Sequence, residues 1–177
     1  MWTGQMRTGL RPFAILLILI LSGIAGAVSS GAVPKPLQYR MTIHMDKGNI
    51  VIQLFPGAAP HTVARVVELI RGKFYNGLTF HRVEPDFVVQ GGDPKGNGTG
   101  GSGVKLKAEF NSKRHVTGTV SMARGKDPDS ADSQFFICLS PHSALDGKYT
   151  VIGQVISGMD VVRKITKGDV MRQVTVQ

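Results

Sequence analysis

The chain has 177 residues and a mass of 19.0 kDa, which suffices for one domain and a tail. A hydrophobic content of 42% excludes wholesale disorder, and the single cysteine, Cys138, excludes an intramolecular disulfide and a multi-cysteine metal site. The net charge of +9 fits either a soluble basic surface, which we favour, or an anionic partner such as nucleic acid or lipid headgroups.

Residues 1–28 have the pattern of an export signal. Arg7 and Arg11 precede an unbroken apolar run over residues 14–21, and Ala25-Gly26-Ala27 has the small-x-small form that signal peptidase accepts. The pattern predicts a cleaved signal peptide. The alternative is a retained anchor, which would attach the chain to the membrane, although residues 13–28 are shorter than the roughly 20 residues that a helix needs to span a bilayer. We therefore expect an exported protein, either periplasmic or anchored to the inner membrane and facing the periplasm.

After a linker over residues 29–38, residues 39–177 read as one domain of short strands with two helices. Segments 41–45 and 49–54 flank a turn and predict a hairpin. Val63, Val66, Val67 and Ile70 recur at helical spacing after Pro60 and predict a helix that ends near Gly72. Further strands are expected over 78–83, 87–90, 116–123, 134–139, 151–155 and 170–176, and a second helix over 159–165. This composition favours a β-barrel with helices at its ends.

Some motifs in this domain mislead. Gly96-Asn-Gly98-Thr-Gly-Gly101 matches the GxGxxG pattern of nucleotide-binding loops, but no helical pattern follows it, so we predict a flexible loop. The five histidines form no pair at ligand spacing, and we expect no metal site. Cys138 lies in an apolar strand and reads as an inert buried thiol.

Residues 80–93 and 133–138 combine apolar and polar groups on predicted strands. Alternation along a strand puts residues i and i+2 on the same face, which pairs Phe80 with Arg82, Val88 with Gln90, and Gln134 with Phe136. Each pair offers one apolar and one hydrogen-bonding group on the same side. The pattern predicts an apolar hollow with fixed polar groups, or alternatively ordinary core faces with a satisfied Arg82.

These motifs favour the first interpretation because they resemble a known family. Phe80-His-Arg-Val, Phe87-Val-Val-Gln-Gly-Gly-Asp-Pro, Ser121-Met-Ala, Ser133-Gln-Phe-Phe-Ile and Leu145-Asp-Gly-Lys-Tyr-Thr-Val-Ile-Gly closely resemble, in order, the cyclophilin-type peptidyl-prolyl cis-trans isomerases. The resemblance covers residues from about Met41 to the C-terminus and is strongest to compact single-domain bacterial members. It implies a mainly β fold, a closed eight-stranded antiparallel barrel capped by two α-helices.

The resemblance also implies roles for individual residues. Arg82 matches the catalytic arginine and Gln90 the glutamine that orients it. The residues that match the substrate groove are Phe87, Val88, Met122, Ala123, Arg124, Gln134, Phe136, Leu145 and Tyr149. The expected substrates are proline-containing unfolded or flexible polypeptides, and neither a metal nor an organic cofactor is implied.

Four positions depart from the best-known eukaryotic pattern. Val88 replaces a methionine, Ala144 a tryptophan and Tyr149 a histidine, so we expect weak cyclosporin binding. Arg124 stands where asparagine is usual and leaves the preference for the residue before proline open.

The sequence thus predicts an isomerase that accelerates the folding of exported proteins. A second hypothesis is a non-catalytic holdase that uses the same groove and the basic surface to bind chains. A third, nucleotide binding by the glycine loop, is disfavoured by the missing helix.

Overall fold

The computed structural model describes residues 38–177. The predicted export signal over residues 1–28 and nearly all of the predicted linker lie outside this range and stay predictions. Within the described range, no helix has the length and apolar composition needed to cross a bilayer.

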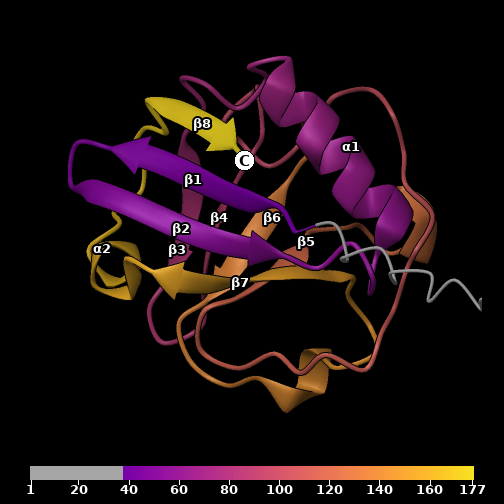
Figure 1. Ribbon diagram of the computed structural model, residues 1–177. Helices are drawn as coiled ribbons and strands as arrows, with labels where there is room; N and C mark the ends of the chain where they lie inside the picture. Colours follow the sequence, from indigo (N-terminus) through magenta and orange to yellow (C-terminus); the bar gives the residue numbers. More distant parts are fainter. Residues whose placement is uncertain (1–37) are drawn as a thin grey trace, which may run out of the picture. The chain divides into compact units, whose positions relative to one another are not determined.

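Eight antiparallel strands form one sheet, in the order β3-β4-β6-β5-β7-β2-β1-β8 (Figure 1). The strands are β1 (Arg40–Met45), β2 (Gly48–Leu54), β3 (Phe80–Glu84), β4 (Val88–Gly91), β5 (Thr119–Met122), β6 (Phe135–Cys138), β7 (Val151–Ser157) and β8 (Gln173–Val176). Every predicted strand is present, and β5 and β8 begin three residues later than the apolar runs at 116 and 170 suggested.

The hairpin between β1 and β2 follows from its turn residues. Met45 pairs with Gly48, which leaves Asp46 and Lys47 as a two-residue turn. Gly48 has a φ of +127°, and a Cβ there would lie 2.9 Å from Val161 Cγ2. Glycine is therefore required at this position for both its backbone conformation and the space that it leaves.

The sheet curls into a half-barrel, so the expected closed barrel was an overstatement. β3 and β8 are its two edges, and a single isolated bridge between Thr79 and Val170 joins the segments that lead into them. Backbone hydrogen bonds between segments 77–80 and 168–171 also cross this gap, but β3 and β8 themselves do not pair.

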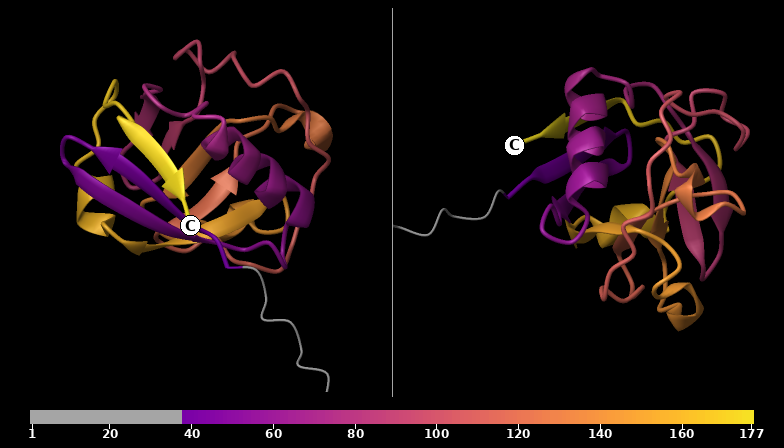
Figure 2. Two further views of the ribbon diagram at one scale, coloured as in Figure 1. Left: turned by 45° about the horizontal axis from the view of Figure 1, so that its top comes forward. Right: turned by 90° about the vertical axis from the view of Figure 1, so that its right-hand side faces the viewer.

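Within residues 38–177, two α-helices accompany the sheet, as predicted: α1 (Pro60–Arg71) and the short α2 (Met159–Arg163) (Figure 2). The predicted apolar stripe of α1 is buried, and the Glu109 carboxylate accepts hydrogen bonds from the amides of His61 and Thr62 in its first turn. An acidic group at this end satisfies free amides and complements the helix dipole. Two 3-10 turns, η1 (Pro128–Ser130) and η2 (Ser143–Leu145), were not expected from the sequence.

The two faces of β4 and β6 have different surroundings. Val89, Phe135 and Ile137 point into the main core inside the curled sheet, and each is at most 1% exposed. Val88 and Phe136 alternate with them and lie in a separate apolar cluster on the outer face. The same strands therefore hold the core together and carry a second surface outside it.

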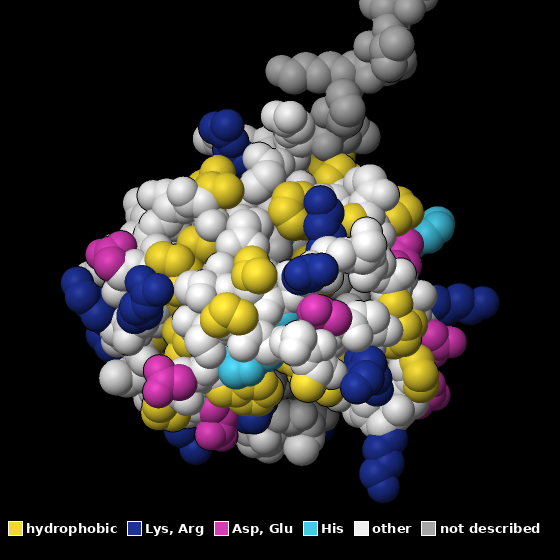
Figure 3. Space-filling model, turned by 90° about the horizontal axis from the view of Figure 1, so that it is seen from below, with side chains coloured by type: hydrophobic (Ala, Val, Ile, Leu, Met, Phe, Trp, Pro, Cys, Tyr) yellow, Lys and Arg dark blue, Asp and Glu magenta, His cyan; other side chains and the backbone are white. Residues whose placement is uncertain are grey.

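Basic side chains do not gather into one patch on the face seen in Figure 3, where they alternate with acidic and apolar ones. This face fits the reading of the net charge as a soluble basic surface.

Candidate active site

An apolar hollow opens on the outer face of the sheet, over β4 and β6. It has a volume of about 200 Å³ and is lined by Arg82, Phe87, Val88, Gln90, Ala123, Arg124, Phe136, Leu145 and Tyr149. The structure therefore brings together all of the predicted site residues except Met122 and Gln134. A small cavity with apolar and aromatic walls and a few fixed polar side chains is suited to one compact apolar ring.

Three polar side chains from neighbouring strands form a chain of hydrogen bonds along the edge of the hollow. Arg82 Nη1 donates to Gln90 Oε1 at 3.2 Å, and Gln90 Nε2 donates to Gln134 Oε1 at 2.9 Å. Gln134 Nε2 in turn donates to the carbonyls of Gly98 and Gly100, at 3.0 and 2.8 Å. The side-chain amides of Gln90 and Gln134 each donate and accept a hydrogen bond in this series. The carbonyls of the loop at Gly98 therefore orient Gln134, which in turn orients Gln90 toward Arg82.

Arg82 lines the hollow from strand β3. Its side chain is 43% exposed, its Nε lies 3.5 Å from Glu84 Oε1, and its Cζ lies 5.6 Å from the centre of the Phe87 ring. No described residue accepts a hydrogen bond from its Nη2. Arg82 can therefore donate to a ligand in the hollow while it remains bonded to Gln90.

Aromatic contacts define the walls of the hollow. The Phe136 and Tyr149 rings meet edge to face with centres 5.6 Å apart, and Phe87 meets the His142 ring in the same way at 4.7 Å. On its other side Phe136 stacks on the His115 ring at 6.0 Å. Edge-to-face contacts restrict ring rotation and keep the hollow in shape.

A buried polar group supports this wall from behind, and the sequence did not reveal it. His115 Nδ1 lies 2.9 Å from Asp146 Oδ1, and Nε2 lies 2.9 Å from Ser121 Oγ. The His115 backbone N–H and ring hold the pKa of Asp146 below its usual value. This arrangement resembles a Ser-His-Asp triad, but Ser121 is fully buried and closed to a substrate. This arrangement links Phe136 to the segment that carries Leu145. His115 and Asp146 are 31 positions apart in the sequence, so no local motif indicated their contact.

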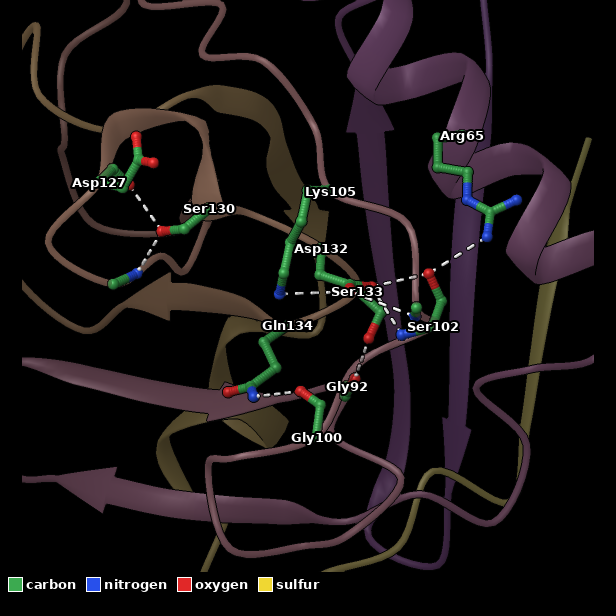
Figure 4. Close-up of polar contacts among 12 residues, drawn as sticks. Arg65, Gly92, Gly100, Ser102, Lys105, Asp127, Ser130, Asp132, Ser133 and Gln134 are labelled. Carbon is green, nitrogen blue, oxygen red and sulfur yellow. Dashed lines mark hydrogen bonds and ion pairs between the residues drawn. The ribbon is translucent and has the colours of Figure 1, made fainter.

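A second cavity of about 290 Å³ adjoins the hollow and is more polar. Its lining residues are Gln90, Gly98, Thr99, Gly100, Lys105, Ala123, Arg124, Gly125, Ser130, Asp132 and Gln134. Figure 4 shows several of them, with Gln134 bonded to Gly100 and Lys105 directed toward Asp132. Gln134 therefore lines the second cavity and not the hollow.

The GxGxxG segment is a loop whose amides are already engaged. The Asp93 carboxylate accepts hydrogen bonds from the backbone N–H groups of Lys95, Asn97 and Gly98, at 2.8, 3.0 and 2.6 Å. No helix follows the loop. The donors that would hold a phosphate in a nucleotide-binding loop are thus directed at Asp93, which explains why the motif here is misleading.

One expectation about side-chain direction was wrong. Phe80 and Arg82 do not share a face, because a bulge in β3 shifts the register between them, so Phe80 packs against Phe135 in the core while Arg82 faces outward. Met122, expected in the groove, is 1% exposed and lies in the main core. Its neighbour Ala123 faces the hollow, as alternation along an extended segment requires.

Cys138 lies beneath the hollow, fully buried beside Val88 and Phe136. Burial raises the pKa of its thiol to about 12. The thiol is therefore protonated and unreactive at neutral pH, as expected for a packing residue.

Comparison with known proteins assigns this architecture. Residues 40–177 match the family described as cyclophilin type peptidyl-prolyl cis-trans isomerase/CLD. A probable peptidyl-prolyl cis-trans isomerase of Brucella suis is 44% identical over 155 residues, with 81% of this chain and 79% of the relative covered. Peptidyl-prolyl cis-trans isomerase B of Bacillus subtilis is 47% identical over 135 residues, with 75% of this chain and 93% of the relative covered.

Solved structures have the same fold. A cyclophilin-type isomerase of Cryptosporidium parvum, crystallised in the presence of the dipeptide Ala-Pro, superposes with a TM-score of 0.72 at 25% identity, covering 78% of this chain and 98% of that one. The cyclophilin AquaCyp293 of Hirschia baltica gives a TM-score of 0.70 at 24% identity, covering 78% of this chain and 76% of that one. The family match over the whole described domain, the curated relatives and the shared fold together show that this chain belongs to the cyclophilin-type peptidyl-prolyl cis-trans isomerases.

Proposed function

We propose that the hollow on the outer face holds the proline ring of an X-Pro substrate and that Arg82 is the catalytic residue. The observation that carries this proposal is the position of Arg82, fixed by Gln90 and directed along an apolar cavity of about 200 Å³. Phe87, Val88 and Phe136 provide the apolar surface for the ring.

The reaction requires rotation about an amide bond with partial double-bond character. Its barrier is about 18–20 kcal/mol, and uncatalysed X-Pro isomerisation takes tens to hundreds of seconds. When the bond twists, the proline nitrogen regains a lone pair that can accept a hydrogen bond. A donor that bonds this nitrogen only in the twisted state stabilises the transition state over the ground state.

Arg82 is suited to this role because its free Nη2 group can donate at the edge of the hollow. The Gln90 bond restricts the guanidinium, so the donor is oriented before the substrate arrives. We assign Gln90 as the positioning residue and as a contact for a substrate carbonyl. The step forms no covalent intermediate and transfers no proton.

The holdase hypothesis is less favoured. Binding alone needs an apolar groove, whereas the bonded series from Gly100 through Gln134 and Gln90 to Arg82 orients one cation toward the groove. The curated relatives are named as isomerases.

We further propose that the enzyme acts on exported proteins, either periplasmic or anchored to the inner membrane. The support for this proposal is the basic and then apolar sequence of residues 1–28, with its small residues at 25–27. Export of a reporter fused to residues 1–38, followed by mass determination of the mature N-terminus, would distinguish cleavage from anchoring. A reporter that stays in the cytoplasm would contradict export.

The catalytic assignment is tested by exchange NMR on an X-Pro peptide. We expect Arg82→Ala to lower the isomerisation rate at least about tenfold, or about 1.4 kcal/mol of transition-state stabilisation, while circular dichroism remains unchanged. Arg82→Lys should also be impaired, because an ammonium cannot donate to Gln90 and to the substrate in the same fixed geometry.

The matched control is Arg172→Ala, which removes an exposed cation that is paired with Asp46 away from the hollow. This variant should keep the wild-type rate. A folded Arg82→Ala variant with wild-type turnover would remove Arg82 from the mechanism.

A further inference from the structure

Arg124 lies on the wall between the two cavities. The hollow and the more polar second cavity share three lining residues, Gln90, Ala123 and Arg124. Any chain that places a ring in the hollow and continues into the second cavity must pass this boundary. Arg124 is the only one of the three that carries a charge.

The guanidinium of Arg124 is held in place from several sides. Nε donates to the Lys148 carbonyl at 3.0 Å, and Nη1 donates to the carbonyls of Gly125 and Lys126 at 2.9 and 3.2 Å. Its Cζ lies 4.8 Å from the centre of the Tyr149 ring. These contacts use three of the five N–H donors and fix the plane of the group.

The remaining two donors, both on Nη2, have no acceptor among residues 38–177. No described carboxylate lies within ion-pair distance of Arg124. The backbone carbonyls that Arg124 binds have no net charge, so its positive charge is not compensated. Because the side chain is half-buried beside Tyr149, solvent screens this charge less than it would at a fully exposed position.

Other charges at the boundary do not cancel this one. Lys105 also lines the second cavity, with its Nζ 3.5 Å from Asp132 Oδ2. The Asp132 carboxylate already accepts hydrogen bonds from the amides of Ser102 and Gly103 and from the Ser102 hydroxyl, as Figure 4 shows in part. The boundary therefore carries a net positive charge and free donors.

We propose that Arg124 determines substrate specificity, by selecting an acidic residue immediately before the proline. This inference rests on the proposed function, because it places the proline ring in the hollow. The preceding residue is about 3.8 Å away along the chain, Cα to Cα. We place it at the boundary because Gln90, which we assign to a substrate carbonyl, lines both cavities there. A carboxylate there accepts hydrogen bonds from the two free Nη2 donors, and little side-chain entropy is lost because the guanidinium is already fixed.

The test uses three peptides that differ only in the residue before proline: Glu, Gln or Lys. We expect wild type to turn over the Glu-Pro peptide with a kcat/KM about fivefold higher than the Lys-Pro peptide, and the Gln-Pro peptide in between. In Arg124→Gln this ratio should fall to about one, whatever the absolute rate of the variant. The ratio within one variant is the readout, so a general loss of activity does not imitate the result.

The matched control is Lys126→Gln, which removes an equal charge from an exposed neighbour that lines neither cavity. Its Glu-to-Lys ratio should stay at the wild-type value. If Lys126→Gln lowers the ratio as much as Arg124→Gln does, the preference reflects the overall field of the surface, and the assignment to Arg124 is wrong.

A second pair of variants tests whether the Tyr149 ring holds the Arg124 guanidinium in place. Tyr149→Phe keeps the aromatic face under the guanidinium and should keep the ratio, whereas Tyr149→Leu removes it and should lower the ratio. Equal kcat/KM values for the three peptides in an active wild-type enzyme would overturn this inference and leave the proposed function standing. Absence of turnover for every peptide would overturn the proposed function itself.

Discussion

The inner and outer faces of β4 and β6 are made by alternating residues of the same strands, yet they differ in what they hold. Inside, Val89, Phe135 and Ile137 pack in a continuous apolar core. Outside, Val88 and Phe136 floor a small open hollow, with Gln90 and Arg82 at its edge. The same two strands therefore pack the core on one side and line the candidate site on the other. Substitutions on the two faces should therefore separate folding from activity.

The largest effect is expected on the inner face. Phe135→Ala removes a ring that meets Tyr75 and Phe80 edge to face, at 5.7 and 6.3 Å, and leaves a cavity in the core. We expect a loss of about 3–5 kcal/mol in the free energy of unfolding, measured by urea denaturation. A loss below about 1 kcal/mol would show that the core is not packed as described.

The matched substitution on the outer face is Phe136→Ala. Because one side of this ring faces the hollow, its loss should cost less stability than Phe135→Ala. Its activity should fall more, with kcat/KM for an X-Pro peptide lowered on the order of tenfold, since the proline ring loses apolar contact. Wild-type kcat/KM in folded Phe136→Ala would mean that the proline binds elsewhere.

Ala144 tests the rim of the outer face. It is exposed on η2, next to Leu145 of the hollow, at the position where the resemblance places a tryptophan. Ala144→Trp should tighten cyclosporin binding by about 1–3 kcal/mol, because an indole adds apolar contact and an N–H donor. Peptide turnover should change little. Ser143→Trp is the control, and equal tightening by both variants would show a nonspecific effect of an added indole.

The smallest effect concerns His81, at the bulge between the two faces. Its ring nitrogens are buried and have no hydrogen-bond partner among the described residues, and desolvation lowers its pKa below 6.5, with Arg82 and Lys167 acting in the same direction and Asp93 against it. The unfolded chain binds the proton more readily, so stability should fall as the pH drops below 6.5 toward the folded-state pKa. His81→Phe should reduce this dependence in urea titrations between pH 7.5 and 5.5. Identical slopes for both proteins would contradict this account.

Much of the fold was predictable because it depends on local patterns. The stripe from Val63 to Ile70 and the turn before Gly48 identify α1 and the first hairpin without tertiary information. The register shift in β3 was not predictable. The one residue between Phe80 and Arg82 is His81, which does not mark a bulge, and strict alternation put Phe80 and Arg82 on one face. Whether the sheet closes was not predictable either, because closure depends on pairing between β3 and β8, which are far apart in the sequence.

The site was predictable to the extent that its residues lie in continuous motifs. Arg82, Gln90 and Phe136 lie within the continuous segments 80–93 and 133–138, and the structure brings them to one hollow. The support from His115, Ser121 and Asp146 could not be predicted, because it joins segments distant in sequence. Met122 was assigned to the groove by the resemblance of its segment to the family, while strand alternation turns its side chain into the core.

Chemical-shift mapping with an X-Pro peptide tests the central claim most directly, because the chain offers a rival cavity. A larger open groove of about 910 Å³ lies elsewhere, lined in part by Leu54, Phe55 and Lys113. Binding to the outer face of β4 and β6 predicts the largest shifts at Val88, Ala123 and Leu145, with the core methyl groups of Val89 and Ile137 far less affected. Shifts concentrated at Leu54 and Phe55, with Val88 and Leu145 unchanged, would contradict it.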